Sequence, residues 1–127
     1  MAEQERMTKC VEQDGVVVVS FLAAHVGIDT EHRLREELQA CTKDQEQPQV
    51  IINLSGVSYV SSSPLGVLTA FERDVSGRKG KLVFCAVGPY VLETFRAAGL
   101  LRLFTVCENC EEALDGFGPS AGGTLSA

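Results

Sequence analysis

The sequence has no tryptophan, no excess of basic residues and no long apolar run. Its formal net charge is -6 at pH 7, so it lacks the basic surface that neutralises nucleic-acid phosphates. No apolar segment is long enough to span a bilayer. The polar start, Met1 to Arg6, also lacks the apolar core of a secretory signal. These absences predict a cytoplasmic protein that binds neither nucleic acid nor membrane.

Cysteine is present, but in an odd number. The five cysteines are irregularly spaced, which predicts reduced thiols rather than a disulfide framework. Cys107 and Cys110 form a CxxC pair, and a thiol redox protein using them is one alternative function. Chance spacing is the preferred interpretation, because a structural zinc site would need a second pair of ligands. We therefore expect no metal and no cofactor.

The length and composition favour one domain. A chain of 127 residues with 45% hydrophobic residues can bury a single core. The stretch from Gly116 to Ala127 is rich in glycine, serine and alanine and is predicted to be a disordered tail. The domain is therefore expected to span residues 1–115.

The first part of the chain predicts a hairpin and a helix. Asp14-Gly15 separates two strand-like segments at 7–11 and 16–22, and this dipeptide favours a tight antiparallel turn. Residues 23–27 are expected to leave the sheet edge. A helix is predicted from Asp29 or Thr30 to Thr42, with Leu34, Leu38 and Cys41 on one face.

The second part alternates strands and helices. The apolar segments 50–54, 81–87 and 103–106 predict strands, and 64–76, 89–98 and 111–114 predict helices. The helix at 89–98 is expected to bury Val91, Phe95 and Ala98. Parallel strands joined by right-handed crossovers follow from this order. The predicted fold is α/β: a mixed sheet of four or five strands, an N-terminal antiparallel hairpin, and helices packed on the sheet.

Three consecutive serines precede Pro64, in the loop that connects the predicted central strand to the next helix. This places them at the carboxyl edge of the sheet, where open α/β sheets locate their sites. Proline is favoured at the first helical position, which makes Ser63 the expected N-cap. From the residues alone, a polar loop with one capping serine is the simpler interpretation. A serine at the positive end of a helix would also suit a phosphate.

Several of these segments together resemble the STAS family, specifically the bacterial anti-sigma factor antagonists. The strongest part runs from Asn53-Leu54-Ser55 to Ser61-Ser62-Ser63-Pro64-Leu65-Gly66. It is similar to the family's Asp or Asn-Leu-Ser segment, followed by an Asp-Ser-Ser-Gly-Leu-Gly box. Ile28-Asp29 and Gly99-Leu100 match two further family positions.

The resemblance implies a partner-binding regulatory module without catalysis of its own. In that family, the domain binds an anti-sigma factor that is also a serine kinase, and a phosphatase reverses the phosphorylation. By position, Ser63 is the implied phosphorylation site and Ser62 its neighbour. The implied contact surface comprises Ser61, Ser62, Ser63, Pro64, Leu65 and Gly66. Ser61 and Pro64 replace the family's Asp and Gly, which leaves open a scaffold that docks partners without being phosphorylated.

Overall fold

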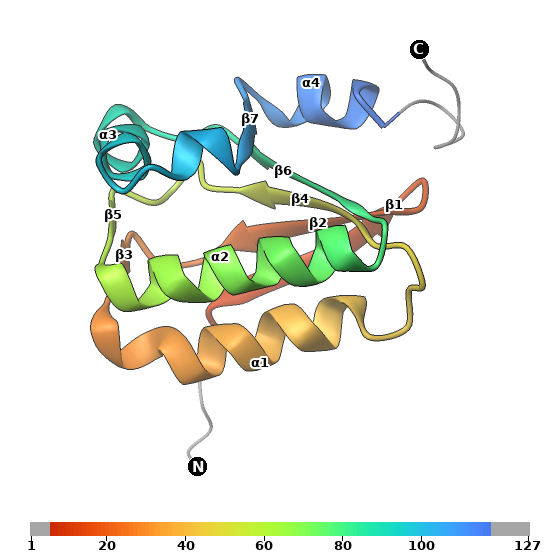
Figure 1. Cartoon of the computed structure of the whole chain (residues 1–127), viewed down its shortest axis with the longest axis horizontal. Helices are drawn as coiled ribbons and strands as arrows, with labels where there is room; N and C mark the ends of the chain where they lie inside the picture. The colour runs from red at the N-terminus through yellow and green to blue at the C-terminus, as the bar shows by residue number, and fades with distance from the viewer. Residues whose placement is uncertain (1–5, 118–127) are drawn as a thin grey trace.

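A five-stranded mixed sheet forms the centre of the computed structural model, which describes residues 6–117 (Figure 1). The strands lie in the order β1-β2-β4-β6-β7. Their bounds are β1 (Thr8–Gln13), β2 (Val16–Phe21), β4 (Gln49–Asn53), β6 (Lys81–Cys85) and β7 (Thr105–Cys107). The helices are α1 (Glu31–Thr42), α2 (Ser62–Gly77), α3 (Pro89–Ala97) and α4 (Cys110–Asp115), with short 3-10 turns at Ile28–Thr30 and Leu100–Arg102.

The predicted hairpin and mixed sheet are confirmed. β1 and β2 pair antiparallel, and every other neighbouring pair in the five-stranded sheet is parallel. Asp14 and Gly15 have φ values of 55° and 83°, so both occupy the left-handed region that the tight turn requires. The predicted central strand is β4, which lies between β2 and β6.

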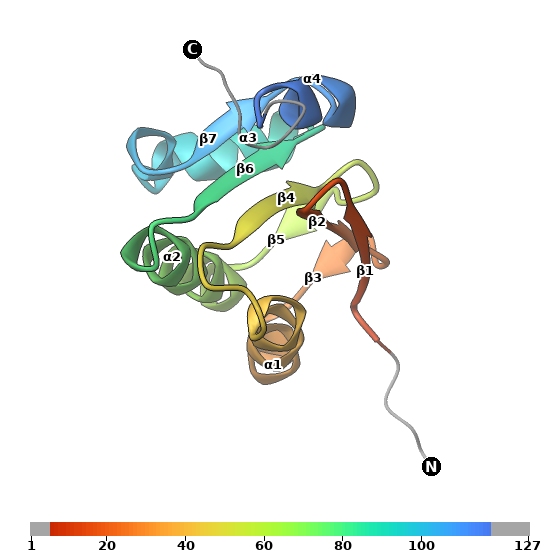
Figure 2. The same ribbon diagram turned by 90° about the vertical axis from the view of Figure 1, so that its right-hand side faces the viewer.

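Helices cover both faces of the sheet. Along β4 and β6, alternate side chains point to opposite faces. Val50, Ile52, Leu82 and Phe84 join a large core with residues of α1, α2 and α3, whereas Ile51, Val83 and Cys85 pack beneath α4. Figure 2 shows α4 on the opposite side of the sheet from α1 and α2. This two-sided cover explains why β4 is apolar at successive positions.

Some predicted details at the ends of elements are wrong. The last strand begins at Thr105 rather than residue 103, because a 3-10 turn occupies Leu100–Arg102. Ala98 is exposed, because α3 ends at Ala97 and the chain reverses at Gly99, where φ is 76°. Phe117 is buried in the core under α4, together with Ala113. Residues 118–127, where most of the predicted tail falls, lie outside the described residues.

The prediction of reduced thiols is wrong for two cysteines. Cys10 in β1 and Cys41 in α1 form a disulfide. The helix packs beside this edge strand, which brings together two residues 31 positions apart. Cys85, Cys107 and Cys110 remain free. Within residues 6–117, no helix has the length and apolar character needed to cross a membrane.

Candidate functional site

The serine segment lies at the carboxyl end of β4, as the sequence predicts (Figure 1). A second, two-stranded sheet holds it there: β5 (Tyr59–Val60) pairs in parallel with β3 (His25–Val26). The backbone N–H groups of Ser58 and Tyr59 both donate to the carbonyl oxygen of Ala24, at 2.8 and 3.2 Å. Residues 23–27 therefore do more than leave the sheet edge, because they anchor the segment that leads into the serines.

Helix α2 begins at Ser62, two residues earlier than predicted. Ser61 is the N-cap, with extended backbone (φ -83°, ψ 177°), and its carbonyl oxygen accepts from the N–H of Leu65 at 3.3 Å. Ser63 is therefore the second helical residue and not the N-cap, and Pro64 is the third residue and not the first. A proline is tolerated throughout the first turn, since the N–H groups there have no intrahelical acceptor.

The three serines differ in exposure. Ser61 is 7% exposed, and its hydroxyl oxygen has no hydrogen-bond partner within residues 6–117. Ser62 is exposed and Ser63 is half-buried. Ser61 does not cap the helix with its side chain. The two hydroxyls that a partner can reach are thus those of Ser62 and Ser63.

The other predicted contact residues also differ in solvent exposure. Pro64 and Leu65 are buried, whereas Gly66 is exposed. Ser62, Ser63 and Gly66 form the solvent-facing part of this first turn and a half, and we call them the serine surface. Pro64 and Leu65 face the core instead, so they shape the surface from beneath.

The electrostatics at this end of α2 favour negative charge. The helix has 16 residues, and its first turn contains no acidic side chain. No side chain caps its first backbone N–H groups, which belong to Ser62 and Ser63 and form the positive end of the helix dipole. A phosphate placed here would therefore meet unpaired donors and the positive end of the helix dipole.

Three exposed apolar side chains lie on elements that neighbour α2 or the strand leading into the serines, and they were missed in the sequence. Ile28 is 67% exposed, Tyr59 52% and Tyr90 79%. The turn containing Ile28 packs beside α2, and the helix containing Tyr90 packs beside β5. Tyr59 also makes an edge contact with His25, with ring centroids 5.8 Å apart. Each residue lies at the start of an element or in a very short strand, where periodicity carries little signal. We call these three side chains the apolar rim.

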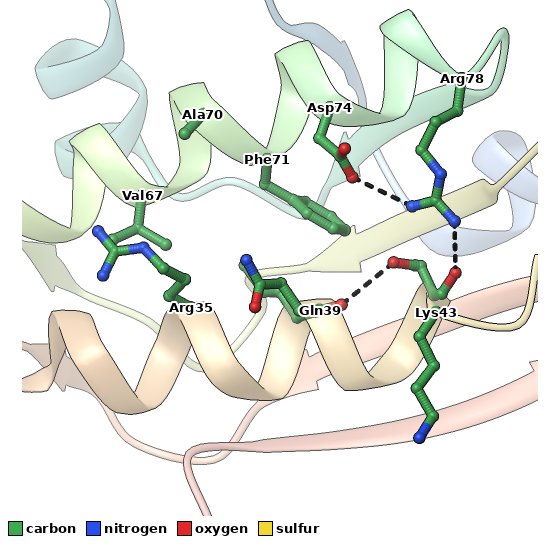
Figure 3. Close-up of a pocket in the computed structure, with 10 residues that line it drawn as sticks. Arg35, Gln39, Lys43, Val67, Ala70, Phe71, Asp74 and Arg78 are labelled. Carbon is green, nitrogen blue, oxygen red and sulfur yellow. Dashed lines mark hydrogen bonds and ion pairs between the residues drawn. The ribbon is translucent and has the colours of Figure 1, made fainter.

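A separate groove of about 410 Å³ lies between α1 and α2 (Figure 3). Its lining includes Val67 and Phe71, but none of the residues from Ser61 to Gly66. At one end, the Arg78 guanidinium donates to the carboxylate of Asp74 at 3.1 Å and to the carbonyl oxygen of Thr42 at 2.8 Å. Arg78 thus binds the C-terminal end of α1.

The CxxC cysteines lie on the opposite face, close to Cys85. Burial raises the pKa of the Cys85 thiol far above its ordinary value, and the neighbouring Cys110 contributes to the same shift. Burial also raises the pKa of Cys107. Within residues 6–117, no group of histidine, cysteine or acidic side chains is arranged to hold a metal ion.

Comparison with known proteins identifies the family of the chain. The model of the STAS domain matches residues 7–113, which is nearly all of the described chain. The chain belongs to the STAS domain family. This match confirms the resemblance that the sequence indicated. The serine segment belongs to the part of the chain where that resemblance is strongest.

One relative and two solved STAS-fold structures are informative. BtrV of Bordetella bronchiseptica, a candidate anti-sigma factor antagonist, is 30% identical over 82% of this chain and 88% of its own. An anti-sigma-factor antagonist domain from Planctomyces limnophilus gives a TM-score of 0.82 at 19% identity, covering 91% of this chain and all of that one.

The second structure is the anti-sigma factor antagonist SpoIIAA, solved in unphosphorylated and phosphorylated forms. The TM-scores are 0.72 and 0.66, at 18% and 17% identity. Each comparison covers 86% of this chain, with 94% and 97% of the SpoIIAA chains. At these identities the two structures establish the shared fold of a mixed sheet with helices.

Proposed function

We propose that the protein is an anti-sigma factor antagonist, which binds an anti-sigma factor with serine kinase activity and is switched by phosphorylation of Ser63. Ser62 is the neighbouring acceptor. The proposal rests mainly on one observation: the hydroxyls of Ser62 and Ser63 lie at the start of α2, which has no side-chain cap, and neighbouring elements carry the exposed apolar rim. The names of the relatives support the same partner class.

The unmodified surface suits a protein partner. Ile28, Tyr59 and Tyr90 supply apolar contact area, and Ser62, Ser63 and Gly66 lie among the elements that carry them. Aromatic side chains surrounded by polar groups are typical of protein interfaces. The antagonist needs no catalytic group for this role. Its partner supplies the phosphoryl transfer, a phosphatase reverses it, and the exchange takes place in the cytoplasm.

Phosphorylation would act on binding more than on folding. A phosphate adds about -1.5 to -2 charge at the positive end of α2, where the fold tolerates it. A partner that covers the apolar rim would have to bury this dianion. A difference of about 5 kcal/mol between the two forms is enough to shift binding almost completely.

The second candidate is a STAS scaffold that docks partners without being phosphorylated. Ser61 and Pro64 favour it, because they replace the family's Asp and Gly on either side of the acceptor. The buried hydroxyl of Ser61, which has no partner among residues 6–117, cannot supply the fixed negative charge of an aspartate. Pro64 also removes one backbone N–H from the first turn.

The test uses the full chain as bait in an extract of the native bacterium, followed by addition of ATP and Mg²⁺. We expect capture of an ATP-binding serine kinase and phosphate on Ser63 by mass spectrometry. Ser63→Ala should lose the phosphate, and Ser63→Asp should capture less kinase. Ser55→Ala, which removes an exposed hydroxyl from the loop between β4 and β5, should match the unmodified chain.

The outcomes separate the two candidates. If the kinase is captured without phosphorylating the chain, and Ser63→Asp captures it equally well, the protein is a scaffold and not a phosphorylation-switched antagonist. Phosphate found only on Ser62 would show that Ser62, and not Ser63, is the acceptor. Failure to capture any ATP-binding protein would overturn the proposed partner class.

A further inference from the structure

Three free thiols converge beneath α4, on the face of the sheet opposite α1 and α2. Cys85 ends β6 and Cys107 ends β7, and the two residues are direct register partners on neighbouring parallel strands. Cys110 is the first residue of α4. All three belong to the core that Phe117 closes. They lie outside the serine surface described above, and the proposed function does not use them.

The closest pair is not the one that the CxxC motif suggests. The sulfur atoms of Cys85 and Cys110 lie 2.8 Å apart, although the residues are separated by 25 positions. Cys85 is fully buried, whereas Cys107 and Cys110 are half-buried. A small oxidant can therefore reach Cys110 while its partner thiol stays shielded behind it.

The backbone already joins the two segments. The N–H of Ala86 donates to the carbonyl oxygen of Glu108 at 3.1 Å, next to Cys85 and two residues before Cys110. The side chain of Asn109 accepts from the N–H of Glu112 at 2.8 Å and fixes the start of α4. Because both segments are held in place, joining the sulfurs requires only a small movement of the side chains.

We propose that Cys110 and Cys85 are a dithiol that hydrogen peroxide converts to an intramolecular disulfide. The Cys110 thiolate attacks one peroxide oxygen, the O–O bond breaks, and the departing hydroxide takes up the proton that the thiol released, giving a sulfenic acid and water. The Cys85 sulfur then attacks the Cys110 sulfur and loses its proton, and a second water leaves. Two thiols are oxidised and one peroxide is reduced to two waters.

The order of attack follows from burial. Burial holds the Cys85 thiol in its protonated form, so Cys85 acts second, on a sulfur already in contact with it. Cys107 lies at the same edge but is not required. An added thiol reductant reverses the reaction by exchange at the half-buried Cys110 sulfur.

The experiment treats the purified full chain with hydrogen peroxide, blocks remaining thiols with iodoacetamide and maps peptides without reduction. We expect one new linkage, between Cys85 and Cys110, with the loss of two hydrogens and with Cys107 alkylated. The Cys10–Cys41 linkage is present before and after treatment and serves as an internal standard.

Two variants make the assignment specific. Cys107→Ser should keep the new linkage, whereas Cys110→Ser should abolish it and leave Cys85 unoxidised. Cys110→Ala repeats the second test without a new hydroxyl, and circular dichroism checks that each variant is folded. A linkage from Cys107 to Cys110, loss of the linkage in Cys107→Ser, or no new linkage at all would overturn the proposal.

Discussion

The backbone N–H of Ser61 donates to the carbonyl oxygen of Val26 at 2.9 Å. This bond continues the pairing of β3 with β5 into the N-cap of α2. The position of the serine surface therefore depends on two strands of two residues each, which form their own small sheet. Val26 is completely buried in the main core, so this small sheet is attached to the larger one through its side chain.

Val26→Ala is expected to lower the free energy of unfolding by about 2 kcal/mol, because it removes buried methyl groups and leaves a cavity. Val11→Ala removes the same atoms from a strand position that is 46% exposed, and should cost less than about 0.5 kcal/mol. Urea denaturation measures both. Equal costs for the two variants would mean that Val26 does not anchor the small sheet.

Ser61→Ala is expected to raise the free energy of unfolding by about 1 kcal/mol, because it removes a buried hydroxyl that has no partner in the described chain and does not cap α2. Asn109 provides the contrast, since its side chain caps α4. Asn109→Ala should cost about 1 kcal/mol. Thermal unfolding of both variants tests this, and a loss of about 1 kcal/mol in Ser61→Ala would show that its hydroxyl does cap the helix.

The serine surface illustrates what could be predicted from the sequence. Local chemistry predicted the hairpin, because Asp14-Gly15 specifies its own turn, and the apolar run predicted β4. The predicted start of α2 was two residues too late, because a proline such as Pro64 fits any position of a first turn. β3 was missed because two residues carry no periodicity, and their partner strand, β5, lies more than thirty residues away in the chain.

The cysteines illustrate a second limit. Pairing of Cys10 with Cys41 depends on how β1 packs beside α1, which the spacing of the residues does not encode. Likewise, the CxxC spacing drew attention to Cys107 and Cys110, whereas the sulfur nearest Cys110 belongs to Cys85 on another strand. Contacts between distant segments decided both outcomes.

Arg78→Ala is expected to lower the free energy of unfolding by about 1.5–3 kcal/mol. The guanidinium donates to the carbonyl oxygens of Thr42 and Gln45, at 2.8 and 2.5 Å, and these bonds to a charged group join α1 to α2. Arg96 is the matched control, because its ion pair with Glu93 is exposed and local. Arg96→Ala should cost less than about 1 kcal/mol. Chemical denaturation compares them, and the prediction fails if the two losses are the same.

Reduction of the Cys10–Cys41 disulfide is expected to lower the free energy of unfolding by about 3–4 kcal/mol, the loop-closure value for residues 31 positions apart. The measurement compares denaturation midpoints of the unmodified chain and of Cys10→Ser/Cys41→Ser, each with and without a thiol reductant. The reductant should affect only the unmodified chain. An identical response in the double variant would assign the effect to another cysteine pair.

Gly66→Ala separates stability from partner binding at the serine surface. Gly66 lies inside α2, and an added Cβ would meet no heavy atom within 4 Å. Alanine should therefore raise the free energy of unfolding by about 0.5–1 kcal/mol, since it is the better helix former. The methyl group nevertheless projects from the exposed face that carries Ser62 and Ser63. We expect the variant to be more stable yet to capture less partner than Gly77→Ala, whose Cβ also meets open space at the far end of the helix. Equal capture by the two variants would mean that the partner does not contact Gly66.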